Sequence, residues 1–131
     1  ISKIASGGEL SRIMLALKSV VADKDLIPTL IFDEIDTGVS GRAARKIGIK
    51  LKEISRSHQV ICVTHLSQIA VMADNHLLIE KKTENDRTFT EVSALDFEGR
   101  VNEIARILSG DSPSSLMLDN AREELKKAMK V

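Results

Sequence analysis

Three short segments of this sequence combine residue types that bind anions, coordinate metal ions or activate water. Ser6-Gly7-Gly8-Glu9 opens an apolar helical pattern, Asp33-Glu34 follows a short apolar run, and His65 follows a second such run. Backbone N–H groups at a helix start bind phosphate, carboxylates bind Mg²⁺ through water, and imidazole donates or accepts protons near neutral pH. Each segment also has an ordinary structural interpretation.

Ser6 and Glu9 have the spacing of a capping box, in which Ser6 accepts from the backbone N–H of Glu9 and Glu9 reaches back. The two glycines between them need another reason, because each costs about 1 kcal/mol relative to alanine inside a helix. Glycines are useful there if something must approach the backbone closely, as an anion at a helix start would. The capping box and the anion site both stay open at this point.

Asp33 and Glu34 follow the apolar run Leu30–Phe32, and ligands of open α/β sheets bind beyond the carboxyl ends of the strands. One carboxylate can face a hydrated Mg²⁺ while the other orients or deprotonates a water molecule. The alternative is an acidic pair that caps the following loop. A lone histidine such as His65 is more often structural than catalytic, but a neutral imidazole at the same sheet edge could donate to a phosphate or position a water.

The elements that must position these residues alternate between strand and helix. Strand, helix, strand and helix at this spacing predict βαβ units, and so an α/β fold with a parallel sheet and helices on its faces. The apolar patterns predict a helix over 10–21, a buried central strand at 30–32, a glycine-containing loop at 37–41, a helix over 44–54, a buried strand at 60–63 and a short helix from Ser67.

The remaining chain predicts a hairpin and two carboxyl-terminal helices. Residues 76–80 and 88–95 favour strands joined by the polar turn at 84–86, and the apolar spacing over 101–108 favours a helix ended by Gly110. Ser112 followed by Pro113 is typical of a helix cap and first helical residue. We expect this last helix to bury Leu118, Ala121, Leu125 and Ala128.

Composition narrows the class of protein. The chain has 131 residues and equal numbers of basic and acidic residues, 19 of each, which suits one domain and argues against bulk-charge coating of nucleic acid. Its only cysteine, Cys62, excludes an internal disulfide framework and a cysteine-cluster zinc site. Phe is its only aromatic type, which disfavours a base-stacking platform, and no apolar run is long enough for a membrane span. Because the chain begins at Ile1, we expect a piece of a longer protein.

Taken together, the motifs resemble those of ABC-type ATPases. Ser6-Gly7-Gly8-Glu9 is similar to their signature motif in the form of the SMC-like branch, residues 30–34 resemble their Walker B strand, and residues 63–65 resemble their switch-histidine segment. The loop at 35–41 and the stretch over 92–123 resemble the RecN family of bacterial SMC-like DNA repair ATPases. The resemblance covers essentially the whole chain.

The resemblance implies the carboxyl-terminal lobe of an ABC/SMC-type ATPase head, which pairs with a second head and sandwiches ATP and Mg²⁺. Two positions depart from the family pattern: Ser40 replaces an interface-loop aspartate, and Ala5 replaces a leucine. The implied roles are contact with the γ-phosphate on the opposite head for Ser6, Gly7, Gly8 and Glu9, Mg²⁺ binding through water for Asp33, general base for Glu34, γ-phosphate sensing for His65, and interface-loop contacts for Gly38 and Ser40.

The sequence contains no Gly-Lys pair, and so no P-loop of the form G-x-x-x-x-G-K-[ST]. We therefore expect residues 1–131 to be one domain, the carboxyl-terminal half of a split head, without the P-loop half and the coiled coil of the family. Alone it should not hydrolyse ATP. The expected partners are the P-loop-bearing amino-terminal half of the same protein and a second head in a homodimer.

The helix after Gly41 is strongly basic. It is either a solvated face or a contact for the DNA backbone, the latter through Arg42, Arg45, Lys46 and Lys50. The expected function is ATP binding and hydrolysis in double-strand-break repair, in the bacterial cytoplasm with the nucleoid and without a membrane. The alternatives are a head fragment of another ABC-type protein, such as an SMC protein or a transporter, and a non-catalytic interaction module.

Overall fold

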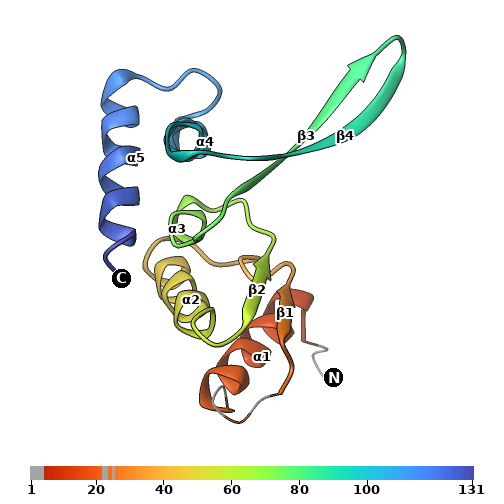
Figure 1. Ribbon diagram of the computed structural model, residues 1–131, viewed down its shortest axis with the longest axis vertical. Helices are drawn as coiled ribbons and strands as arrows, with labels where there is room; N and C mark the ends of the chain where they lie inside the picture. Colours follow the sequence, from red (N-terminus) through yellow and green to blue (C-terminus); the bar gives the residue numbers. More distant parts are fainter. Residues whose placement is uncertain (1–4, 22–23, 25) are drawn as a thin grey trace.

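The structure, a computed structural model, describes residues 5–21, 24 and 26–131. Within these residues the order of elements expected from the sequence is confirmed (Figure 1). The elements are helix α1 (Gly7–Val21), strand β1 (Thr29–Phe32), helix α2 (Gly41–Ile54), strand β2 (Gln59–Cys62), helix α3 (Ser67–Ala70), strands β3 (Leu77–Glu84) and β4 (Arg87–Ala94), and helices α4 (Phe97–Ser109) and α5 (Ser115–Ala128).

Strands β1 and β2 form the predicted parallel pair. Thr29 lies opposite Gln59 and Phe32 lies opposite Cys62, and α2 makes the connection between the two strands. The backbone N–H of Val63 donates to the carbonyl of Phe32 at 3.0 Å, so the pairing continues one step past the last paired residues. Both strands therefore end at one edge, where the candidate site residues follow.

The described helices pack against only one face of this pair, so the expectation of helices on the faces of the parallel sheet holds for one face. Leu30 and Phe32 are buried in a cluster with residues of α1, α2 and α3. Side chains alternate along a strand, so Ile31 points the other way, and it is 70% exposed. Ile61 and Val63 are likewise exposed. The described residues thus leave an apolar sheet face open.

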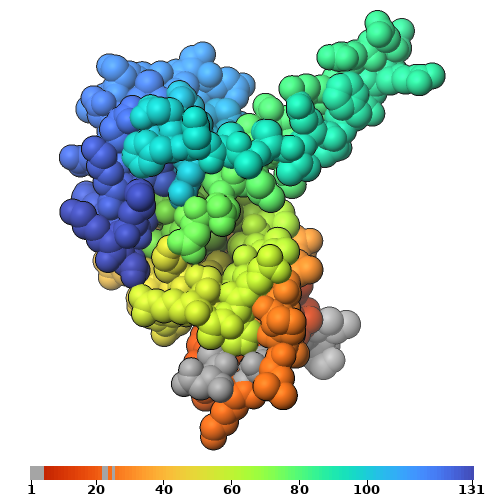
Figure 2. All heavy atoms as spheres, viewed as in Figure 1, coloured from red at the N-terminus to blue at the C-terminus, as the bar shows by residue number. Residues whose placement is uncertain are grey.

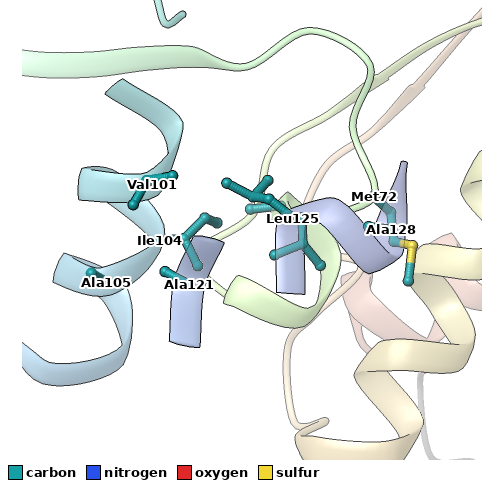
Figure 3. Close-up of a cluster of buried hydrophobic side chains, with 9 residues drawn as sticks. Met72, Val101, Ile104, Ala105, Ala121, Leu125 and Ala128 are labelled. Atoms are coloured by element: carbon teal, nitrogen blue, oxygen red, sulfur yellow. The ribbon is translucent and has the colours of Figure 1, made fainter. Parts of the chain in front are cut away.

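A second core joins α4 and α5 to the end of α3 (Figure 3). Ala121, Leu125 and Ala128 of α5 are buried as the sequence predicts, and Leu118 packs beside them. Facing residues of α4 and the segment after α3 complete the cluster: Val101, Ile104, Ala105, Ala70, Val71 and Met72.

Strands β3 and β4 form an antiparallel hairpin that projects from the rest of the molecule (Figure 2). Both strands reach the turn, where Glu84 pairs with Arg87, so β3 is longer than the sequence pattern suggests and β4 has the predicted length but begins one residue earlier. The two turn residues, Asn85 and Asp86, have φ angles of 49° and 60°. Positive φ at both positions is the requirement of a type I′ turn, whose twist matches that of the flanking strands.

The start of the last helix differs from the expectation. Helix α5 begins at Ser115, and its cap is Ser114, whose hydroxyl accepts from the backbone N–H of Met117 at 3.3 Å. The prediction of Ser112 and Pro113 as cap and first helical residue is wrong, because the second serine supplies the same capping oxygen two residues later. Asp96 caps α4 in the same way, accepting from Gly99 N at 2.7 Å.

Candidate functional site

The carboxyl ends of β1 and β2 bring two of the predicted segments to one edge. Asp33 and Glu34 follow β1 directly, and Thr64 and His65 lie two and three residues beyond the end of β2. The Asp33 carboxylate accepts from the backbone N–H of Glu34 at 2.8 Å, which fixes its orientation beside the strand. The parallel pairing thus places the acidic pair and the histidine segment as the sequence analysis expects.

Helix α1 holds the loop after β1 through two polar side chains in its second turn. Ser11 Oγ donates to the Asp33 carbonyl at 2.8 Å, and Arg12 Nη1 donates to the Ile35 and Thr37 carbonyls at 3.2 and 2.8 Å. These bonds tie the Ser6–Glu9 segment to the acidic pair.

The Ser6–Glu9 segment forms the capping box. Ser6 N donates to Glu9 Oε2 at 2.9 Å, and Glu9 N donates to Ser6 Oγ at 3.3 Å. The close approach that the glycines allow is made by the chain itself. A Cβ on Gly7 would meet the carboxylate of Glu34, and a Cβ on Gly8 would lie 2.8 Å from the Glu34 carbonyl oxygen. The two glycines therefore have a packing role at this junction.

Glu34 has an unusual backbone conformation. Its φ is 57°, in the left-handed region that residues other than glycine adopt rarely. Its carbonyl accepts from Thr37 N at 3.0 Å, which closes the turn that follows. Strained backbone of this kind is concentrated at functional sites, which makes Glu34 a stronger candidate than its position alone does.

Asp36 connects the loop after β1 to the histidine segment. Asp36 is only 5% exposed. Its Oδ2 accepts from Thr64 Oγ1 at 2.6 Å and from the backbone N–H of His65 at 2.9 Å. The same oxygen lies 3.0 Å from Nδ1 of His65, whose side chain is 77% exposed. The buried carboxylate of Asp36 thus contacts the backbone and Nδ1 of His65, while the rest of the imidazole ring faces solvent.

The charge state of Asp36 follows from these contacts. Burial raises the pKa of Asp36, whereas the hydrogen bonds from Thr64 and the His65 backbone, together with the nearby His65 ring, lower it, and the pKa ends below its ordinary value. Asp36 is therefore an ionised hydrogen-bond acceptor near neutral pH.

Cys62 supplies no reactive thiolate at this edge. Burial, with the charges of Asp36 and Asp33, raises the pKa of its thiol to about 11. The thiol is protonated near neutral pH, and a protonated thiol is a poor nucleophile and metal ligand.

The loop from Gly38 to Gly41 leads into α2 through two glycines with positive φ, 73° at Gly38 and 51° at Gly41. Ser40 occupies the cap position of α2, but its side chain makes no capping hydrogen bond. Its hydroxyl therefore does not have the usual structural role of a serine at that position.

Most of the cations of the basic helix α2 have partners within the chain. Arg45 pairs with Glu124 at 3.2 Å and Lys50 with Glu53 at 2.6 Å. Lys52 pairs with Asp74, and Arg56, just beyond the end of the helix, donates to the Val131 carbonyl at 3.0 Å. Arg42 and Lys46 have no partner among the residues that the structure describes.

Sequence reasoning missed four residues of this edge: Ser11, Arg12, Asp36 and Thr64. Ser11 and Arg12 interrupt an apolar helical pattern side by side, which is a signal for polar contacts at a helix–loop junction. Asp36 and Thr64 carry no comparable signal, since their pairing depends on the parallel register of β1 and β2.

The described part of the chain has neither a metal-binding cluster of side chains nor a membrane-spanning helix. Within residues 5–21, 24 and 26–131, no group of three or more His, Cys, Asp or Glu side chains could hold a metal ion. Across the same ranges, no helix has both the length and the apolar character needed to cross a membrane.

Comparison with known proteins first defines the class. A solved structure described as concerning the ATP-driven dimerization and DNA-stimulated activation of SMC ATPases matches with a TM-score of 0.58 and 22% identity, over 82% of this chain and 65% of that one. The fold is therefore that of part of an SMC-type ATPase head, as expected from the sequence. No family model matches the chain.

The chain is a homologue of the DNA repair protein RecN, as the sequence motifs indicate. Over all 131 residues it is 48% identical to RecN of Halalkalibacterium halodurans and 47% identical to RecN of Bacillus subtilis, and over 125 residues it is 50% identical to RecN of Rickettsia typhi. It spans about a quarter of these relatives, 23% of each, and matches their carboxyl-terminal part.

Proposed function

We propose that this chain is the carboxyl-terminal half of an ATPase head that acts in DNA repair, completed by a P-loop-bearing half and paired with a second head. The observation that carries the proposal is the identity of 47–48% to RecN proteins over the whole chain. The parallel edge at which Asp33, Glu34 and His65 follow their strands supports it.

The residues at this edge suit Mg²⁺ and a phosphate-bearing nucleotide. Mg²⁺ in phosphate-transfer sites keeps several waters and needs only one or two carboxylates beside the phosphates, so the oriented carboxylate of Asp33 fits it. The metal would neutralise charge on the phosphate oxygens. Glu34 would accept a proton from the attacking water, and phosphoryl transfer depends mainly on such positioning and charge stabilisation.

The Ser6–Glu9 segment would meet the nucleotide of the opposite head. The Glu9 carboxylate accepts from Ser6 N in the capping box, and the Ser6 hydroxyl accepts from Glu9 N but can still donate its own proton. The Ser6 hydroxyl and the backbone N–H groups at the start of α1 would then be the phosphate donors. The Gly38–Gly41 loop would lie at the head–head interface, with the uncommitted hydroxyl of Ser40 facing the partner head.

Turnover of ATP tests the proposal. We expect the chain alone to show no ATP turnover, and we expect a mixture with the P-loop-bearing half of the same protein to hydrolyse ATP. Ser6→Ala in the mixture should lower turnover, with Ser114→Ala, which removes the corresponding cap of α5, as the matched control that leaves it unchanged. Turnover by the chain alone would contradict the split head. A mixture that associates but stays silent would favour a non-catalytic interaction module.

We also propose DNA as a partner of α2. Arg42 and Lys46 are the cations of this helix without a partner in the described structure, so their charges are available to phosphates. The double variant Arg42→Gln, Lys46→Gln should weaken DNA binding and flatten its salt dependence. The control is Arg45→Gln, Lys50→Gln, whose cations are paired within the chain. Equal weakening by both pairs would indicate a general charge effect instead.

A further inference from the structure

Asp36 and His65 form a close pair, made of one backbone hydrogen bond and one ring contact, that links the loops after the two parallel strands. Asp36 Oδ2 lies 3.0 Å from His65 Nδ1 and also accepts from the backbone N–H of His65. Two contacts to the same residue fix both the backbone and the ring. The Asp36 carboxylate is buried and held in place, whereas the His65 ring is exposed and can contact a ligand.

The chemistry of a carboxylate determines where the imidazole proton lies. An ionised carboxylate has no proton to share and repels the lone pair of an unprotonated ring nitrogen, so at 3.0 Å it favours a proton on Nδ1 of His65. A neutral imidazole carries one proton, which leaves Nε2 without one. Neutral His65 can then accept a hydrogen bond at Nε2 but cannot donate one there. Of the two roles that the sequence analysis leaves open for a neutral imidazole here, this proton placement is compatible with positioning a water and not with donating to a phosphate.

We propose that Asp36 is a positioning residue that holds the His65 proton on Nδ1, so that Nε2 accepts from a water when His65 is neutral and donates to a phosphate only when His65 is protonated. Thr64 supports the pair, because its hydroxyl donates to the same carboxylate oxygen at 2.6 Å and accepts from Leu66 N at 3.1 Å. The contact of Nε2 with a water or phosphate of ATP rests on the proposed function. The position of the proton on Nδ1 does not depend on that function.

The ring nitrogens of His65 report the proton directly by ¹⁵N NMR of the 131-residue chain. Spectra recorded at a series of rising pH values identify the neutral ring by its one protonated and one unprotonated nitrogen. Comparison with His65→Gln assigns the signals against those of His58 and His76. We expect the wild-type chain to show a protonated Nδ1 and an unprotonated Nε2 at His65.

Asp36→Asn should shift the ring proton from Nδ1 toward Nε2, because an amide oxygen in the place of Oδ2 can keep the contacts with Thr64 and the His65 backbone but carries no charge to favour a proton on Nδ1. Asp74→Asn is the matched control: it removes a carboxylate that pairs with Lys52, away from His65, and should leave the pattern unchanged. A wild-type His65 protonated on Nε2 would overturn the proposal, and this test needs no variant to fold.

A second readout separates this proposal from the proposed function. In the mixed ATPase assay, Asp36→Asn should lower kcat about tenfold or more, the range seen when a residue that orients a functional histidine is changed. A silent mixture together with a protonated Nδ1 would count against the proposed function and uphold the positioning role. An active mixture with Nε2 protonated would uphold the function and refute the role of Asp36.

Discussion

At the scale of single residues, the signature glycines and the acidic pair act on one another. Gly8 lies against the backbone carbonyl of Glu34, whereas Gly7 lies against its flexible carboxylate. The same exchange of Gly for Ala should therefore have different effects at two adjacent positions. The difference separates a packing requirement from helix propensity, which favours alanine at both.

Gly8→Ala should lower the free energy of unfolding by about 1–3 kcal/mol, because its Cβ would lie 2.8 Å from a backbone oxygen that cannot move without shifting the turn. Gly7→Ala should change it by less than about 1 kcal/mol, since the Glu34 side chain can rotate away. Urea denaturation of both variants measures the difference. Equal stability of the two would show that the loop does not pack on α1 as described.

The sequence predicted which residues of the site would share an edge, because motif order and parallel pairing determine it. It did not predict what the glycines contact. Glu34 and Gly7 are far apart along the chain, and their proximity depends on hydrogen bonds from Ser11 and Arg12 to carbonyls, which side-chain patterns do not encode. Asp36 was missed because its contact with Thr64 depends on the parallel register of β1 and β2.

At the scale of elements, a buried arginine joins the end of α3 to α4. Arg100 is 8% exposed, and its Nη2 donates to the Ala73 carbonyl at 2.7 Å and lies 3.5 Å from the Val71 carbonyl. Helix α3 is only four residues long, so it depends on tertiary contacts for its stability. Because α3 follows His65 closely, this contact also supports the functional edge.

Arg100→Ala should lower the free energy of unfolding by about 2 kcal/mol or more, because it leaves buried carbonyls unsatisfied and removes packing of the arginine stem. The matched control is Arg122→Ala on α5. Arg122 pairs with Glu98 and lies over the Phe97 ring but is more exposed, so its loss should cost under about 1 kcal/mol. Denaturation curves with equal losses for the two variants would contradict the role given to Arg100.

Element types and order were predictable because their apolar spacing is regular, and the core of α5 followed from that spacing. The first and last residues of the helices and strands were less predictable. Two serines compete for the cap of α5, and only the packed structure selects Ser114. The expectation of helices on the faces of the parallel sheet holds for one face: Leu30 and Phe32 are buried, whereas Ile31 and Ile61 are exposed among the described residues.

At the scale of the whole molecule, exposed apolar surface includes the hairpin of β3 and β4 and two surfaces near the candidate site. The outer side of α1 exposes Ile13 and Leu17, and the open face of the sheet exposes Ile31 and Ile61. Large exposed apolar patches mark interaction surfaces. In the proposed head, the P-loop-bearing half would cover such surface, and without it copies of the chain should cover one another.

We therefore expect the isolated chain to self-associate and the substitutions Ile13→Lys and Leu17→Lys together to reduce the association. Leu116→Lys is the control, since Leu116 is an exposed apolar residue on α5, outside these two surfaces. Sedimentation velocity measures all three proteins. A wild-type chain that stays monomeric at high concentration would argue that the exposed surface is not an interface.

The central claim is that Glu34 is the general base of an ATPase head built from this chain and a P-loop-bearing half. The most direct measurement is kcat for ATP in the reconstituted mixture with Glu34→Gln, beside Glu53→Gln as a matched substitution on α2. The account predicts a loss of about 10²–10⁴-fold for Glu34→Gln, the usual contribution of a general base, and none for Glu53→Gln. Turnover that is unchanged by Glu34→Gln would contradict it.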